Sequence, residues 1–258
     1  RKYNMYPESV EDAFGYRSQM EDYDYRYGIP RTVRDMNGYT VQYHIDDLGR
    51  VDTIIAPNEQ SAGVPYTIAY QYVKGADYKT SYAVTSHYDP QHPNDPLKTI
   101  THVDGLGRPY QVKKEAEIMN DNKQAEVKYV VSGRTKYDAL GRTVATTHPT
   151  ICASANALSI VGFNNNMLNS TTYDAIDRPL TQTLPAEQGG DASITRMSYA
   201  IEEGKMETIV IAPNDDESYS YTNGAGQTVK TGRIDPNTGD IVSINYTFDP
   251  IGQLDSLI

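Results

Sequence analysis

Short runs in which apolar and polar residues alternate recur along the chain, and turn-forming residues separate them. Clear examples are residues 67–73 and 126–131, together with residues 242–248, which follow a turn at 234–241 as the second half of a hairpin. An apolar residue at every second position is typical of a β-strand that buries one face. The sequence therefore predicts an all-β fold made of repeated antiparallel β-hairpins.

One turn phrase joins many of these runs. It begins with Asp or Asn, has Gly or a substitute at its fourth position and, in four copies, continues with Arg. The clearest copies contain Asp46, Gly49 and Arg50; Asp104, Gly107 and Arg108; Asp138, Gly141 and Arg142; Asp174, Asp177 and Arg178; and Asp249, Gly252 and Gln253. Two weaker copies contain Asp35 and Gly38, and Asn223 and Gly226. The intervals between copies are irregular, which indicates insertions.

Each phrase predicts a type I turn between two strands. Asp or Asn is favoured at the first position because its side chain accepts hydrogen bonds from backbone N–H groups of the turn. Gly can adopt the positive φ that the end of such a turn requires, and Asp177 tolerates this conformation better than most residues would. The acidic residues that look most catalytic are therefore predicted to shape turns.

The residues around the phrase support the prediction of strands. A β-branched or aromatic residue stands directly before the acidic residue in five copies, at Ile45, Val103, Tyr137, Tyr173 and Phe248. A proline stands eight residues after the fourth position in three copies, at Pro57, Pro149 and Pro185. Because proline cannot donate a hydrogen bond to a strand ladder, we expect strands to end there. Two polar inserts, 11–26 and 153–169, are expected to be loops or to hold a turn or two of helix.

The repeats also suggest how the chain is divided. Residues 1–34 are expected to be a strand and loop region that leads into the repeats. Residues 35–258 are expected to form the repeat sheet, with loop insertions at about 54–100 and 150–170. Both ends of the sequence are abrupt, so we expect a fragment of a longer array whose open edges pair with further repeats.

Composition narrows the classes of partner. The chain has 22 Tyr, 3 Phe and no Trp, which suits sheets with one face near water. The net charge of −11 argues against nucleic acids and anionic membranes as partners, because both are negatively charged. The single cysteine, Cys152, excludes an internal disulfide, and no apolar run approaches the roughly 18 residues of a membrane helix. We therefore predict neither nucleic-acid binding nor direct membrane insertion.

Few residues suggest chemistry of their own. His87 and His92 lie close together in a proline-rich segment, but their spacing matches no tetrahedral zinc site. Residues 235–240 are similar to part of a calcium loop, yet Tyr246 stands where a bidentate Glu is needed, so a hairpin turn is favoured. Cys152 lacks a local nucleophile motif. The sequence predicts no catalytic residue, no metal site and no cofactor.

The repeat resembles that of a known family. Residues 137–142 and 173–178 are similar to the tyrosine-aspartate (YD) repeat of bacterial Rhs proteins, and residues 103–113 resemble repeats in the Rhs-like B and C components of insecticidal toxin complexes. Animal teneurins carry the same repeat. The resemblance extends from about Asp35 to the last residue. It implies a sheet that winds as a spiral of hairpins into a hollow shell, which in the toxin members encloses a C-terminal toxin domain.

Two functions follow as expectations. The first is a structural wall segment of a secreted or cell-surface bacterial YD-repeat protein. Its partners would be the rest of the same polypeptide, the enclosed C-terminal domain and components of a secretion or toxin complex. The second is a Tyr-rich adhesive module that binds a receptor or a carbohydrate, with residues 23–27 as the candidate patch. An enzyme is not expected, since the self-cleavage site that ends the Rhs core is missing from these residues.

Overall fold

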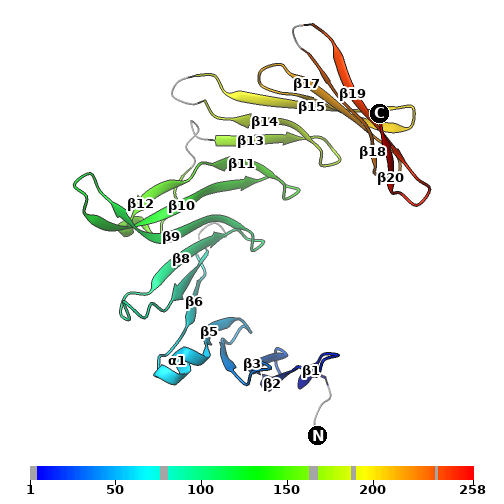
Figure 1. The fold of residues 1–258 in the computed structure, drawn as a ribbon. Coiled ribbons are helices and arrows are strands. Elements are labelled where there is room, and N and C mark those ends of the chain that lie inside the picture. The colour runs from blue at the N-terminus through cyan, green and yellow to red at the C-terminus, as the bar shows by residue number, and fades with distance from the viewer. Residues whose placement is uncertain (1–4, 76–80, 163–167, 187–189, 236–237) are drawn as a thin grey trace. The chain divides into compact units, whose positions relative to one another are not determined.

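The computed structural model describes residues 5–75, 81–162, 168–186, 190–235 and 238–258 (Figure 1). Within these ranges lie twenty β-strands, one short α-helix and one 3-10 helix. All twenty strands belong to one antiparallel sheet, so the predicted all-β fold of repeated hairpins is confirmed.

The chain divides into two units. The first contains Arg1–Ser132 and Pro149–Val161, and the second contains Gly133–His148 and Gly162–Ile258. The strands of the first unit are β1 (Ser9–Glu11), β2 (Arg17–Asp24), β3 (Ile29–Arg34), β4 (Thr40–Ile45), β5 (Val51–Ile55), β6 (Ile68–Val73), β7 (Tyr82–His87), β8 (Leu97–Val103), β9 (Pro109–Met119) and β12 (Thr150–Ala153). Those of the second are β11 (Thr143–Thr147), β13 (Leu168–Tyr173), β14 (Pro179–Leu184), β15 (Ser193–Glu202), β16 (Lys205–Ile211), β17 (Glu217–Thr222), β18 (Thr228–Ile234), β19 (Ile241–Phe248) and β20 (Leu254–Leu257). Strand β10 (Ala125–Tyr137) contributes residues to both units.

Strand order follows chain order almost throughout. Strands β1 to β9 pair one after another in the first unit, and β13 to β20 do so in the second. The first part of β10 pairs with β12, and its last residues pair with β11, which in turn pairs with β13. Neighbouring hairpins thus satisfy each other's backbone hydrogen bonds, which a lone hairpin cannot do.

Two expected loop regions are instead strands. Residues 11–26 contain the last residue of β1, the turn after it and all of β2, and no helix. Residues 54–100, expected to be a loop insertion, contain β6 to β8 and the helix α1 (Pro57–Ala62). Pro57 does follow the end of β5, but it also starts α1, because the first helical position needs no N–H donor.

The other expected insertion is mixed. Residues 150–170 include β12, a 3-10 helix (Ser154–Asn156) and the start of β13, while residues 163–167 lie outside the described residues. The predicted strand ends at Pro149 and Pro185 are confirmed, since β11 ends at Thr147 and β14 at Leu184. Strands β3 and β4 pair across the expected boundary between residues 34 and 35, and that division stays a prediction.

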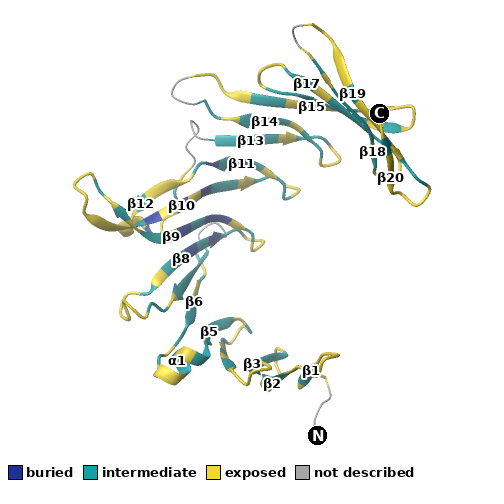
Figure 2. Cartoon of the chain, viewed as in Figure 1, coloured by how far each residue is buried: buried dark blue, intermediate teal, exposed yellow. Residues whose placement is uncertain are grey.

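Burial is concentrated in a few strands (Figure 2). One hydrophobic cluster contains Ile100 on β8, Tyr129 on β10 and Ala157, with Tyr82, Val84 and Cys152 packed against it. Residues 153–161, here called the covering segment, lie over this cluster. In the other strands most residues are half-buried or exposed. In β14 the half-buried row contains the polar residues Thr181 and Thr183, and the exposed row contains Leu180 and Leu184. Strand pairing, rather than a continuous apolar core, therefore organises most of the sheet.

The covering segment is held by two buried polar side chains of β9. The Gln111 amide donates to Val161 O at 3.0 Å and accepts from Val161 N–H at 2.9 Å, as a strand neighbour would. The Lys113 ammonium donates to the carbonyls of Asn156, at 3.0 Å, and Ser159. Both side chains are buried, so the covering segment supplies the hydrogen-bond partners that these side chains need away from water.

Candidate functional site

All seven phrases lie at hairpin turns with one common geometry. In the turn at Asp138, the Asp138 N–H donates to Arg142 O at 3.0 Å, and the Gly141 N–H donates to Asp138 O at 3.1 Å. The N–H groups of Leu140 and Arg142 both donate to Asp138 Oδ1 at 2.9 Å. The same two backbone bonds form at Asp35, Asp46, Asp104, Asp174, Asn223 and Asp249. The side chain at the first position thus satisfies N–H groups that the turn leaves without a strand partner.

The fourth residue of each phrase has a positive φ. Gly49, Gly107, Gly141, Gly226 and Gly252 have φ between +76° and +86°. Asp177, the one substitute, has φ +69°. In six of the hairpins the strand register shifts by one residue beside the turn, for example between Lys136 and Tyr137 and between Thr172 and Tyr173. This is the three-residue hairpin loop in which a type I turn ends in a left-handed residue that makes a bulge.

Arginine adds an ion pair to four of the turns. The Arg Nε donates to the second carboxylate oxygen of the same turn's Asp at 2.7–2.8 Å in the pairs Asp46–Arg50, Asp104–Arg108, Asp138–Arg142 and Asp174–Arg178. Partial burial would by itself raise the pKa of Asp138. The hydrogen bonds from the Arg142 side chain and backbone outweigh that effect and hold this pKa below its usual value. The carboxylates are therefore kept ionised as acceptors, which is the opposite of what a general acid requires.

A tyrosine from a later strand lies on the arginine of an earlier turn. The guanidinium carbon is 4.1–4.9 Å from the ring centre in the pairs Arg50–Tyr72, Arg142–Tyr173 and Arg178–Tyr199. Each of these tyrosine hydroxyls donates at 2.8–2.9 Å to the carbonyl of the residue after the arginine, namely Val51, Thr143 and Pro179. The tyrosine therefore fixes both the side chain and the backbone at the exit of the earlier turn.

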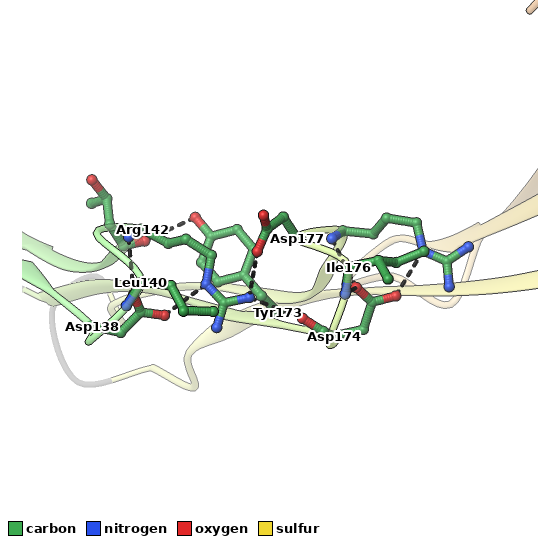
Figure 3. A network of polar contacts seen from close by, with 9 residues as sticks. Asp138, Leu140, Arg142, Tyr173, Asp174, Ile176 and Asp177 are labelled. Atoms are coloured by element: carbon green, nitrogen blue, oxygen red, sulfur yellow. Dashed lines mark hydrogen bonds and ion pairs between the residues drawn. The ribbon is translucent and has the colours of Figure 1, made fainter.

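Figure 3 shows this contact between two successive repeats. Tyr173, the residue before Asp174, stacks on Arg142 of the preceding turn. Arg142 also donates through Nη1 to Asp174 O and to Asp177 Oδ1, both at 2.9 Å. Arg142 thus links its own turn to the next one through a carboxylate, a carbonyl and an aromatic ring.

The last two phrases lack arginine, and in the turn at Asn223 side-chain amides take its place. Asn223 Nδ2 donates to Gln227 Oε1 at 2.9 Å, and Gln227 Nε2 donates to the carbonyl of Gly252 in the following turn at 3.2 Å. The contact from one turn to the next is therefore kept, without its charge.

Three further turns of this geometry were not predicted from the sequence. One begins at Asp12 and ends at Gly15, and one begins at Asn120, with Lys123 at φ +58°. The third begins at Ala212 and has Asp215 at φ +63°. The first could have been found from its Asp and Gly spacing, whereas Ala212 has no side-chain acceptor that would mark it.

The other candidate residues do not gather into a reactive site. His92 Nδ1 lies 2.8 Å from Asp89 Oδ2 within a turn, and His87 ends β7. Asp235 forms a hairpin turn with Asp240, although residues 236–237 lie outside the described residues. Among the residues that the structure describes, no group of three or more His, Cys, Asp or Glu could hold a metal ion. In the same ranges, no helix is long and apolar enough to cross a membrane.

Comparisons with known proteins agree with the fold. No protein-family model and no curated protein matches the chain. A crystal structure of TcdB2-TccC3 matches 97% of this chain and 15% of that one, with a TM-score of 0.73 and 17% identity. TcdB2-TccC3 without its hypervariable C-terminal region matches 97% and 17%, with a TM-score of 0.71 and 15% identity.

A third match comes from the Tc holotoxin pore of Photorhabdus luminescens with a mutation in TccC3. It covers 97% of this chain and 17% of that one, with a TM-score of 0.70 and 16% identity. The chain thus spans 15–17% of the length of these structures. The resemblance to toxin-complex components is confirmed at the level of the fold: this chain has the antiparallel β-fold of a segment of TcdB2-TccC3.

Proposed function

We propose that this chain is a structural wall segment of a secreted bacterial Rhs or YD-repeat protein, whose β-shell encloses or carries a C-terminal toxin or effector domain. The observation that carries the proposal is the contact from turn to turn, in which Arg142 binds Asp138, Tyr173 and Asp177 at once. Such contacts stiffen a sheet that has little core of its own, because each hairpin gains stability from its neighbours. The likeness to TcdB2-TccC3 supports the shell.

The partners in this proposal belong mainly to the same polypeptide. They are the neighbouring repeats, the enclosed C-terminal domain and the components of a secretion or toxin complex. The turn carboxylates serve as ionised acceptors within the fold, so a structural role is proposed rather than a catalytic one. The net charge of −11 further favours partners other than nucleic acids.

The alternative of a Tyr-rich adhesive module loses much of its support. Tyr72, Tyr173 and Tyr199 place their rings on arginines and their hydroxyls on carbonyls of the same sheet. The rings and hydroxyls of these tyrosines therefore already have partners within the sheet. A binding role is favoured only near Tyr23 and Tyr25, where a half-buried ring and an exposed ring lie together apart from the arginine turns.

Limited proteolysis of the full natural polypeptide tests the shell. The domain that follows the repeats should resist protease in the intact protein and be digested rapidly when expressed alone. The double variant Arg142→Gln, Arg178→Gln should shorten this protection, while Arg196→Gln, an exposed arginine on β15, should leave it unchanged. Equal digestion of the downstream domain with and without the repeats would refute the proposal.

A further inference from the structure

Three tyrosines near the start of the first unit pack against one another. The ring centres of Tyr6 and Tyr23 lie 5.3 Å apart, those of Tyr6 and Tyr25 6.3 Å, and those of Tyr23 and Tyr25 6.2 Å. The Tyr23 hydroxyl donates to Pro7 O at 2.6 Å, which ties the segment before β1 to β2. A Cβ atom at Gly28 would lie 2.7 Å from the Tyr6 hydroxyl oxygen, so the glycine makes room for this ring. The cluster is therefore built into the fold.

An irregularity in β2 accompanies the tyrosine cluster. The register with β3 is the same on both sides of Asp22, since Glu21 pairs with Thr32 and Tyr23 pairs with Pro30. Asp22 has φ +51°, which is unfavourable for a residue with a side chain. Backbone strain of this kind is often found beside binding sites.

The tyrosines and Asp22 line one hollow of about 410 Å³. Its wall includes the carboxylates of Glu8, Glu21 and Asp22 and one cationic side chain, that of Arg17, while Glu21 Oε1 also lies 3.6 Å from Nε of Arg34 outside the wall. Arg17 directs Nη2 to Ser9 Oγ at 3.1 Å. The hollow therefore combines aromatic faces with an excess of negative charge, and its size falls in the usual range of small-ligand pockets.

We propose that this hollow binds an organic cation with a quaternary ammonium group, of which choline is the simplest representative. The face of a tyrosine ring attracts such a cation electrostatically, and the methyl groups pack on the ring at the same time. Tyr25 is 65% exposed and offers the most accessible face. The carboxylates supply the opposite charge, which is strongest at low ionic strength. The site is independent of the shell proposed above, since it uses none of the arginine turns.

Titration with choline chloride tests the site, with tyrosine ring signals in NMR spectra as the readout. The neutral isostere 3,3-dimethylbutan-1-ol is the matched probe, because it has the same shape without the charge. We expect saturable shifts with choline, at least tenfold weaker binding of the isostere, and weaker choline binding at high salt. Equal binding of both probes, or no saturable binding of choline, would overturn the proposal.

Variants locate the binding site on the chain. Tyr25→Ala should weaken choline binding by about tenfold, whereas Tyr25→Phe should preserve it, since the aromatic face remains. Glu21→Gln should weaken it on the order of threefold. Tyr39→Ala is the control, because Tyr39 is similarly exposed, at 61%, but lies at another turn. Circular dichroism checks that the variants fold. Unchanged binding in Tyr25→Ala, or equal losses in Tyr25→Ala and Tyr39→Ala, contradicts the assignment.

Discussion

Single residues decide the turns through two separate requirements. The first, met in every such turn except the one at Ala212, is a side-chain acceptor on the first residue, which Asp138 offers to two backbone N–H groups. The second is a positive φ at the fourth residue, which Gly141 reaches at +85°. Lys123, Asp177 and Asp215 satisfy the second requirement without glycine, so the conformation is accessible to other residues at an energetic cost.

Gly141→Val should destabilise the protein by about 1–2 kcal/mol, because a β-branched residue is forced into the left-handed region. Urea unfolding monitored by circular dichroism measures the change in the free energy of unfolding. Gly141→Asn is the control and should cost less, since Asn tolerates this region. A valine variant as stable as the wild type would show that positive φ is not required at this position.

Asp138→Asn should remove part of the pH dependence of stability. Asparagine keeps the acceptor of the turn, as Asn223 does, but loses the ion pair with Arg142. The folded-state pKa of Asp138 lies below its unfolded value of about 3.9, so ionisation stabilises the fold above that pH. The stability difference between wild type and variant should be largest near neutral pH and shrink as the pH falls through the folded pKa. Melting curves between about pH 2 and pH 7 test this, and a pH-independent difference would contradict it.

At the scale of elements, hairpins are coupled by tyrosines as well as by backbone pairing. Tyr173 belongs to β13 but binds the arginine and a carbonyl beyond the turn between β10 and β11. Tyr173, which stands directly before Asp174, thus stabilises the turn of the phrase before its own. This explains why tyrosine, rather than phenylalanine, serves here: the ring and the hydroxyl each have a partner.

Tyr173→Phe should cost about 1 kcal/mol, because the Thr143 carbonyl loses its donor while the ring stays on Arg142. Tyr173→Leu should cost more, since the aromatic face is lost as well. Urea unfolding compares the two variants. In combination with Arg142→Gln, the effect of Tyr173→Leu should be smaller than in the wild type, and full additivity would argue against a direct contact.

Features that depend on neighbouring residues could be predicted from the sequence, whereas features that depend on contacts between distant residues could not. The turn at Asp138 could be recognised because its acceptor and its glycine lie within four residues. The turn at Ala212 could not, since its formation depends on strands β16 and β17 pairing around it. The same is true of Gln111, which binds Val161 fifty residues away. Helix α1 was missed because Pro57 marks both the end of a strand and the start of a helix.

Lys113 offers a test of the covering segment. Burial lowers the pKa of Lys113, so in alkaline solution the unfolded chain holds a proton that the folded chain has released. Relative to Lys113→Met, wild-type stability should therefore rise with pH between the folded-state pKa and about 10.4. Melting temperatures of both proteins across this range provide the measurement. A constant difference between them would indicate that Lys113 is not desolvated.

For the molecule as a whole, apolar burial is very uneven. Ile100 is 1% exposed beneath the covering segment, whereas Ile244 on β19 is 45% exposed and Val242 is 72% exposed. Stability should follow this distribution, because backbone pairing alone contributes little net free energy. The part of the sheet around β8 to β10 should consequently open last, and β19 and β20 should open early.

Two matched substitutions test this distribution. Ile100→Ala leaves a cavity in the buried cluster and should destabilise the protein by about 2–4 kcal/mol. Ile244→Ala removes the same side-chain atoms from an exposed position and should change stability by no more than about 0.5 kcal/mol. Hydrogen exchange should show the slowest amides in β8 and β10 in the wild type, with faster exchange there in Ile100→Ala. Equal protection of the amides of β19 would contradict this prediction. It would mean that the exposed side chains of the second unit are buried in solution, since a sheet with one face in water protects its amides less well than a buried one.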